Sequence, residues 1–116
     1  EVEFDDRLQR LNGATEIVKN RYSAFSSTKL DKVLHRAGVR RLAVCGFMTN
    51  FCCESTARSA HDNGYYVDFI VDATGTPGTE KMNEKRIRKV VGELLQAGFA
   101  RVYDTAAYLR VLAREL

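Results

Sequence analysis

Short apolar runs alternate with amphipathic segments along most of the chain. Four runs have the length and character of strands, at residues 15–19, 42–45, 65–71 and 100–103. Apolar residues recur at helical spacing in the segments between and after them, at residues 28–37, 51–63, 79–97 and 105–116. This alternation predicts an α/β fold, a three-layer α-β-α arrangement with a parallel sheet and Rossmann-like right-handed crossovers.

Local signals set the predicted ends and inner faces of the helices. Thr28 is a good N-cap for the first helix, Gly38 ends it, and Thr105 caps the last one. The helix at 51–63 has a stripe of small residues, which lets a helix lie close on a sheet: Cys53, Thr56, Ala57 and Ala60. The stripe of the helix at 79–97 is larger: Ile87, Val90, Val91, Leu94 and Leu95.

Chemically useful residues follow three of the predicted strands. The run from Leu42 to Cys45 is apolar throughout, as in parallel strands that are buried on both faces. Ligands of open α/β sheets bind outside the carboxyl ends of the strands. Lys19, the turn Gly46–Cys52 and Asp72 stand at such ends, so we expect them to converge on one side of the sheet.

Cys52 is the candidate nucleophile, because it stands where the turn becomes a helix. Unpaired N–H groups at a helix start favour negative charge and bias a cysteine there toward the thiolate. Backbone amides of the same turn would supply donors for an oxyanion. The alternative is a small buried hydrophobe, which is the reading that fits Cys45 and Cys53.

Lys19 is the charged partner that we expect for Cys52. A lysine leaving a strand toward a pocket stabilises a thiolate or a developing oxyanion, although such residues are also commonly just solvated. Tyr22 and Phe25 follow in the next loop. They are candidates for pocket walls, or for lids on the core.

Composition narrows the class of protein. The 116 residues suffice for one domain, residues 1–116, and the net charge of +3 gives no argument for nucleic acid or membrane partners. Three cysteines, two of them adjacent, fit free thiols in a reducing, cytoplasmic compartment rather than a disulfide framework. Adjacent cysteines bridge only with strain, which argues against a redox pair.

Other chemistry is not indicated. His35 and His61 fit surface or structural roles, and the basic run at 85–89 fits a solvated helix face. The sequence has no metal-ligand spacing and no phosphate-binding glycine motif, so we expect no metal and no cofactor.

Two motifs together resemble the isochorismatase-like cysteine hydrolase family. They are KNRYSAF at 19–25 and CGFMTNFCCESTAR at 45–58, and the resemblance extends over about residues 15–104. That family includes nicotinamidases, N-carbamoylsarcosine amidohydrolase, ureidoacrylate and biuret hydrolases, and isochorismatases. The resemblance implies a small-molecule substrate and a parallel α/β sheet.

The resemblance also implies roles for individual residues. Cys52 matches the nucleophile and Lys19 the triad lysine, while the backbone amides of Met48 and Cys52 match the oxyanion hole. Phe47–Met48 falls at a non-proline cis peptide, and Phe47 and Phe51 join Tyr22 and Phe25 as expected substrate-pocket residues. A cysteine at position 52 implies hydrolysis of an amide or ureido C–N bond through a thioester.

One member of the family's triad has no match. The aspartate of the first family strand has no counterpart, and neither Asp5 nor Asp6 has an apolar strand before it. The chain thus reads as the C-terminal portion of the family's domain, without its N-terminal strands and general base. The alternatives are an inactive fragment, a binding or assembly module, or an isochorismatase-type hydrolase of another bond. Family members usually self-associate, so we expect a homo-oligomer, favoured further by any unpaired sheet edge.

Overall fold

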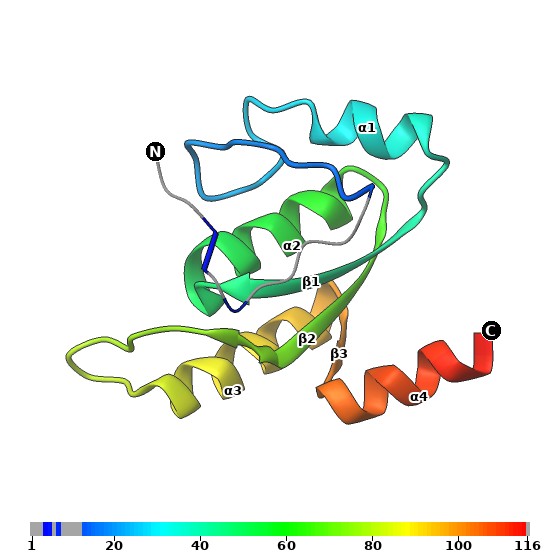
Figure 1. The fold of residues 1–116 in the computed structure, drawn as a ribbon. Helices are drawn as coiled ribbons and strands as arrows, with labels where there is room; N and C mark the ends of the chain where they lie inside the picture. Colours follow the sequence, from blue (N-terminus) through cyan, green and yellow to red (C-terminus); the bar gives the residue numbers. More distant parts are fainter. Residues whose placement is uncertain (1–3, 6, 8–12, 116) are drawn as a thin grey trace.

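A computed structural model describes residues 4–5, 7 and 13–115. Strands and helices alternate along it from residue 41 onward (Figure 1). In chain order the elements are α1 (Leu30–Arg36), β1 (Arg41–Phe47), the π-helical turn η1 (Thr49–Cys53), α2 (Glu54–Asp62), β2 (Tyr66–Gly75), α3 (Glu84–Gly98), β3 (Arg101–Tyr103) and α4 (Thr105–Glu115).

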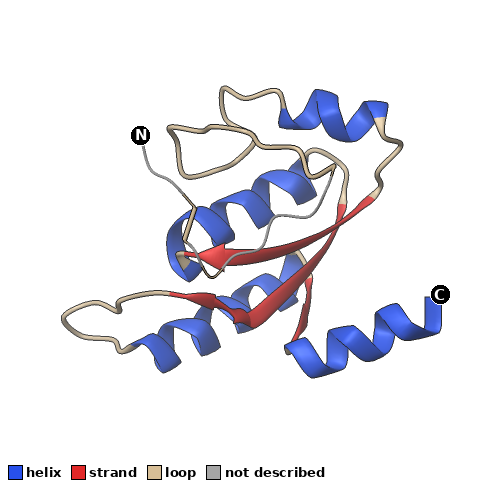
Figure 2. Ribbon diagram, viewed as in Figure 1, coloured by secondary structure: helices blue, strands red, loops and turns tan. Residues whose placement is uncertain are grey.

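The three strands form one parallel sheet in the order β1-β2-β3. Figure 2 shows this sheet at the centre of the molecule with the helices around it. The β1–β2 pairing starts at Arg41 and Tyr66 and is irregular farther along, where Val44 pairs with Phe69 but Gly46 pairs with Thr74. β2 therefore follows a longer path than β1 at the carboxyl end of the sheet.

The hydrophobic core lies between the sheet and the pair α2 and α3. Ala57 and Ala60 of α2 are fully buried, and so are Phe69 of β2 and Leu95 of α3. The small side chains let α2 approach the strands closely, as the stripe of small residues predicted. In α3 the predicted stripe is right except at Leu94, which is 52% exposed.

The other face of the sheet is covered by α4. Side chains alternate across a strand, so Asp68 and Ile70 of β2 face away from the α2–α3 core. Both are buried, and Tyr108 of α4 lies near Asp68: burial, and then the Asp68 carboxylate, raise the pKa of the Tyr108 hydroxyl. Arg41 completes this contact with an Nη1–Oδ1 distance of 2.8 Å to Asp68. Helices thus lie on both faces of a parallel sheet, which confirms the predicted α/β class.

The predicted strand at 15–19 is wrong. These residues are extended but pair with no strand among the described residues, and Val18 is 81% exposed. A short apolar run becomes a strand only where another backbone accepts its hydrogen bonds. Here Lys19 instead ends an open segment that leads into the loop at 20–28.

The prediction that 42–45 is buried on both faces is also wrong. Val44 is buried, but Ala43 and Cys45 are exposed. The reason is position: among the described residues β1 is an edge strand whose only neighbour is β2, and α4 packs on β2. Cys45 is therefore not the buried hydrophobe that its place in the sequence indicated.

Several predicted ends shift by a few residues. The helix predicted from residue 79 begins at Glu84, because the Asn83 side chain caps it by accepting from the Arg86 N–H. The last helix is capped by Asp104, whose Oδ1 accepts from the Ala107 N–H, and not by Thr105. The first helix begins at Leu30 after N-cap Lys29, and the Thr28 hydroxyl accepts from the Leu30 N–H.

Candidate active site

The turn that follows β1 presents Cys52 at the carboxyl end of the sheet. The peptide bond Phe47–Met48 is cis, as the family resemblance implied. The Met48 carbonyl then accepts from the Cys53 N–H at 3.0 Å, which closes the wide π-helical turn η1. π-Helical turns of this kind are frequent at functional sites. Since η1 runs directly into α2, Cys52 stands where turn and helix join.

Lys19 and Cys52 lie together, although 33 residues separate them in the chain. The Lys19 Nζ is 3.3 Å from the Cys52 Sγ. The same ammonium donates to the carbonyls of Arg21 at 2.8 Å and Tyr22 at 3.1 Å. These three contacts use the three donors of an ammonium, so the charge is held against the sulfur.

The neighbouring Cys53 has a buried thiol with a raised pKa. Cys53 is buried, and this burial, with the nearby Cys52 and Cys45 sulfurs, raises the pKa of its thiol to about 12. The Lys19 charge opposes this shift but does not cancel it. Cys53 therefore stays protonated near neutral pH and serves as a small apolar side chain, as predicted.

A cavity of about 360 Å³ lies beside Lys19 and Cys52, along β1. Its volume is at the small end of the range for ligand pockets. Most of its lining is apolar, and the described residues that line it include no Asp, Glu or His. The lining residues are Lys19, Ala24, Leu30, Leu34, Leu42, Ala43, Val44, Cys45, Phe47, Cys52, Cys53 and Thr56.

The four aromatic residues expected in a substrate pocket are placed differently. Phe47 lines the cavity and is 66% exposed. The rings of Tyr22 and Phe51 pack on each other, tilted by 38° with centroids 5.1 Å apart. Tyr22 follows Lys19 by three residues, and Phe51 directly precedes Cys52. Phe25 packs on Tyr65 and against the core, so its position is that of a lid.

Of the expected oxyanion-hole residues, Met48 directly precedes the turn η1 and Cys52 lies within it, so their amides belong to the segment that carries the nucleophile. Their role stays a prediction.

Asp72 does not join Lys19 and Cys52. Its Oδ1 accepts from both the N–H and the hydroxyl of Thr105, each at 2.7 Å. The Thr105 hydroxyl is the main reason that the pKa of Asp72 is lowered. β2 continues to Gly75, so Asp72 lies within the strand and faces the start of α4 instead of the cavity.

Sequence reasoning missed a set of hydroxyl contacts around the turn. Thr49 and Thr74 are buried and hydrogen-bonded to each other at 2.8 Å, which ties η1 to β2. The Ser23 hydroxyl donates to that of Ser59 at 2.8 Å, and Thr56 Oγ1 accepts from the Ala24 N–H at 2.9 Å. The sequence does show small hydroxyl residues at position 23 and at positions 55, 56 and 59. It does not show which groups they bond to, because those partners are far apart in the sequence.

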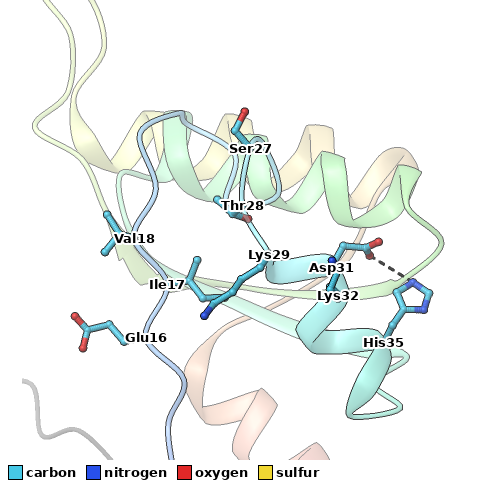
Figure 3. A pocket seen from close by; sticks show the side chains of 9 residues that line it. All are labelled: Glu16, Ile17, Val18, Ser27, Thr28, Lys29, Asp31, Lys32 and His35. Carbon is cyan, nitrogen blue, oxygen red and sulfur yellow. Dashed lines mark ion pairs between the residues drawn. The ribbon is translucent and has the colours of Figure 1, made fainter.

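A larger hollow of about 960 Å³ lies elsewhere, between the extended segment 16–18 and α1 (Figure 3). Figure 3 shows Ile17 and Val18 across from the α1 residues, where Asp31 pairs with His35. No sulfur lines this hollow, so it is separate from the Cys52 site. Asp5 is also occupied elsewhere, in an ion pair with Arg7 that lowers its pKa to about 2, and Asp6 lies outside the described residues.

Two negative findings concern the described residues alone. They contain no group of three or more His, Cys, Asp or Glu side chains arranged to hold a metal ion. None of their helices combines the length and apolar character that a bilayer crossing requires.

Comparison with known proteins gives relatives with named activities. Nicotinamidase 3 of Arabidopsis thaliana is 42% identical over 96 residues, which cover 82% of this chain and 46% of that protein. The ureidoacrylate amidohydrolase RutB of Methylorubrum extorquens is 33% identical over 110 residues, 95% of this chain and 42% of that protein. The chain thus spans less than half the length of these two relatives.

Solved structures share the fold. A cysteine hydrolase from Pseudomonas syringae matches with a TM-score of 0.83 and 28% identity, over 93% of this chain and 53% of that one. An isochorismatase from Pseudomonas putida matches with a TM-score of 0.83 and 31% identity, over 90% of this chain and 56% of that one. The family model of the isochorismatase domain matches residues 1–107. On these grounds, the chain belongs to the isochorismatase family.

Proposed function

We propose that the chain carries the nucleophile of a cysteine hydrolase that cleaves a small amide or ureido C–N bond. The observation that supports this most directly is the 3.3 Å contact between the Lys19 ammonium and the Cys52 sulfur at the edge of a small cavity. The activities named for the nicotinamidase and the ureidoacrylate amidohydrolase are of this class.

In the proposed reaction the Cys52 sulfur attacks the substrate carbonyl carbon. The amides of Met48 and Cys52 then bind the oxyanion, where preorganised donors contribute most to such catalysis. When the C–N bond breaks, the nitrogen leaves as an amine or ammonia that has taken up the thiol proton, and a thioester remains. Water then cleaves the thioester, releases the acid and returns the thiol.

Proton transfer in both steps needs a general base. The described residues that line the cavity supply no carboxylate and no imidazole for it. We therefore assign the nucleophile, its lysine and its oxyanion donors to this chain and assign no base.

The test is the turnover of small amides and ureido compounds by the Cys52→Ala variant of the full protein. Loss of the nucleophile is expected to reduce kcat by at least about a thousandfold. Cys45→Ala is the matched control, because it removes another thiol from the same cavity but keeps the nucleophile. Its kcat should fall far less than that of Cys52→Ala. Turnover by Cys52→Ala at the unsubstituted rate would refute the proposal.

A second candidate is that the chain by itself is an inactive fragment or a binding or assembly module. The absence of a base among the described lining residues favours it. Iodoacetamide labelling of the 116-residue chain near neutral pH separates the two. Selective, rapid modification of Cys52 supports a preformed nucleophile, whereas labelling no faster than that of a free cysteine supports the second candidate.

A further inference from the structure

The segment that carries Lys19 has no regular structure of its own. Residues 14–28 contain neither helix nor strand, yet the lysine at position 19 must be held against a sulfur on another element. A lysine side chain is long and flexible, so the position of its ammonium depends on how firmly the backbone of that residue is held. Whatever fixes the loop at 20–28 also fixes the distance from the ammonium to the sulfur.

The loop is fixed by hydroxyl groups of α2. Ser23 is only 7% exposed, which is unusual for a loop residue, and its hydroxyl donates to Ser59 at 2.8 Å. The same oxygen accepts from the Phe25 N–H at 3.2 Å, so both its donor and its acceptor capacity are used. The next residue, Ala24, donates its N–H to Thr56 Oγ1 at 2.9 Å.

Thr56 and Ser59 belong to the same continuous segment as Cys52. Thr56 and Ser59 are three residues apart in α2 and so lie on one face of it, and Cys52 comes just before α2, in the turn η1 that continues into it. The continuous segment η1–α2 therefore meets the loop at three points: Cys52 with Lys19, Thr56 with Ala24, and Ser59 with Ser23. The nucleophile and the anchors of its lysine are parts of one rigid element.

We propose that Thr56 and Ser59 are positioning residues that set the Lys19–Cys52 separation and thereby the nucleophilicity of Cys52. Neither transfers a proton to the substrate in this proposal; both act through the loop. The proposal rests on the proposed function for its catalytic meaning, but the separation itself can be tested without substrate.

The test is the rate of Cys52 alkylation by iodoacetamide between about pH 6 and about pH 9, where the thiolate is the reacting species. All variants carry Cys45→Ser, so that the exposed Cys45 does not react, and fragment-ion mass spectrometry separates Cys52 from Cys53. Thr56→Val keeps the side-chain shape but removes the acceptor. Ser59→Ala removes the other anchor at a position that does not line the cavity.

Thr56→Val and Ser59→Ala are each expected to slow alkylation of Cys52 at neutral pH by roughly threefold to tenfold and to move the profile of rate against pH toward higher pH. Thr56→Ser, which keeps the acceptor, should restore the rate. In a Lys19→Ala background neither substitution should slow alkylation further, because its effect passes through the lysine. A merely structural role would not produce this loss of additivity.

Three outcomes overturn the proposal: unchanged alkylation in folded Thr56→Val and Ser59→Ala, equal slowing with and without Lys19, or failure of Thr56→Ser to restore the rate. If Thr56→Val does not fold, Ser59→Ala alone is judged by the same criteria. Failure of the hydrolase proposal has a different signature, namely normal turnover by Cys52→Ala, and it leaves the alkylation results unaffected.

Discussion

At the scale of single residues, the three cysteines show how far the environment decides the chemistry of one side-chain type. Cys45 is exposed, Cys52 touches an ammonium, and Cys53 is buried beside both. The expectation that Lys19 and Cys52 converge at one side of the sheet agrees with their contact, although residues 15–19 do not form the strand from which it was argued. Nothing in the local sequence separated Cys45 from a buried strand residue, because its exposure depends on what lies beside β1.

The raised pKa of Cys53 has a consequence for stability. Its thiol goes from an ordinary pKa of 9.0 to about 12 in the folded protein. Between these values the unfolded chain loses a proton that the folded chain keeps, so the free energy of unfolding falls as the pH rises. The contribution of Cys53 to stability is therefore complete below about pH 9 and is lost as the pH rises toward 12. We expect Cys53→Ala to lose less stability than the unsubstituted protein over this interval.

The measurement is urea unfolding at several alkaline pH values. Cys45→Ala is the matched control, because it removes an exposed thiol but keeps the burial of Cys53, the main cause of the raised pKa, so the alkaline slope should change far less. Parallel slopes for the Cys53→Ala variant and the unsubstituted protein would contradict the assignment.

At the scale of elements, the contact between β2 and α4 is made by polar groups rather than by a buried apolar face. α4 has no buried residue, and Leu109 and Leu112 on it are exposed. Asp72 holds the first residue of the helix through two hydrogen bonds from Thr105. The amphipathic pattern predicted the helix, but only the structure shows which residue fastens it.

Asp72→Ala is expected to loosen α4. Trypsin should then cleave faster after Arg110, and the thermal midpoint should fall, since the start of the helix loses its anchor. Because the folded pKa of Asp72 is lowered, its contribution is present above the ordinary value of 3.8 and is lost as the pH falls through the lowered one.

The difference in thermal midpoint between Asp72→Ala and the unsubstituted protein should therefore vanish in acid. Glu93→Ala, which removes an exposed carboxylate from α3, is the control. Equal cleavage rates for all three proteins would show that Asp72 does not hold α4.

At the scale of the whole molecule, the parallel order of the sheet and the helices on its two faces followed from alternation of β and α segments. Several of the missed features concern the outer side of β1, among them the exposure of Ala43 and Cys45, and residues 15–19 form no strand among the described residues. Strand pairing and burial on that side depend on a neighbouring backbone, and a local apolar pattern cannot show whether one is present. The expected self-association is likewise a property of surfaces and stays a prediction.

Among the described residues only β2 pairs with β1, and this divides the amides of β1 into two populations. The Arg40 carbonyl accepts from the Tyr66 N–H, and every second residue of a parallel strand points the same way. The amide hydrogens of Leu42 and Val44 therefore point at β2, and those of Ala43 and Cys45 point outward. In dilute solution, exchange with deuterated water should be slow at the first pair and close to the free-peptide rate at the second.

The exchange rates of the outward-pointing amides therefore show whether another strand pairs with β1. Any chain that adds a strand to this edge, whether another copy or another part of a longer protein, must slow Ala43 and Cys45 while leaving Leu42 and Val44 as they were. Residue-resolved exchange measured against protein concentration would register that addition directly. Uniform protection of all four amides at the lowest concentration would mean that the edge is already occupied.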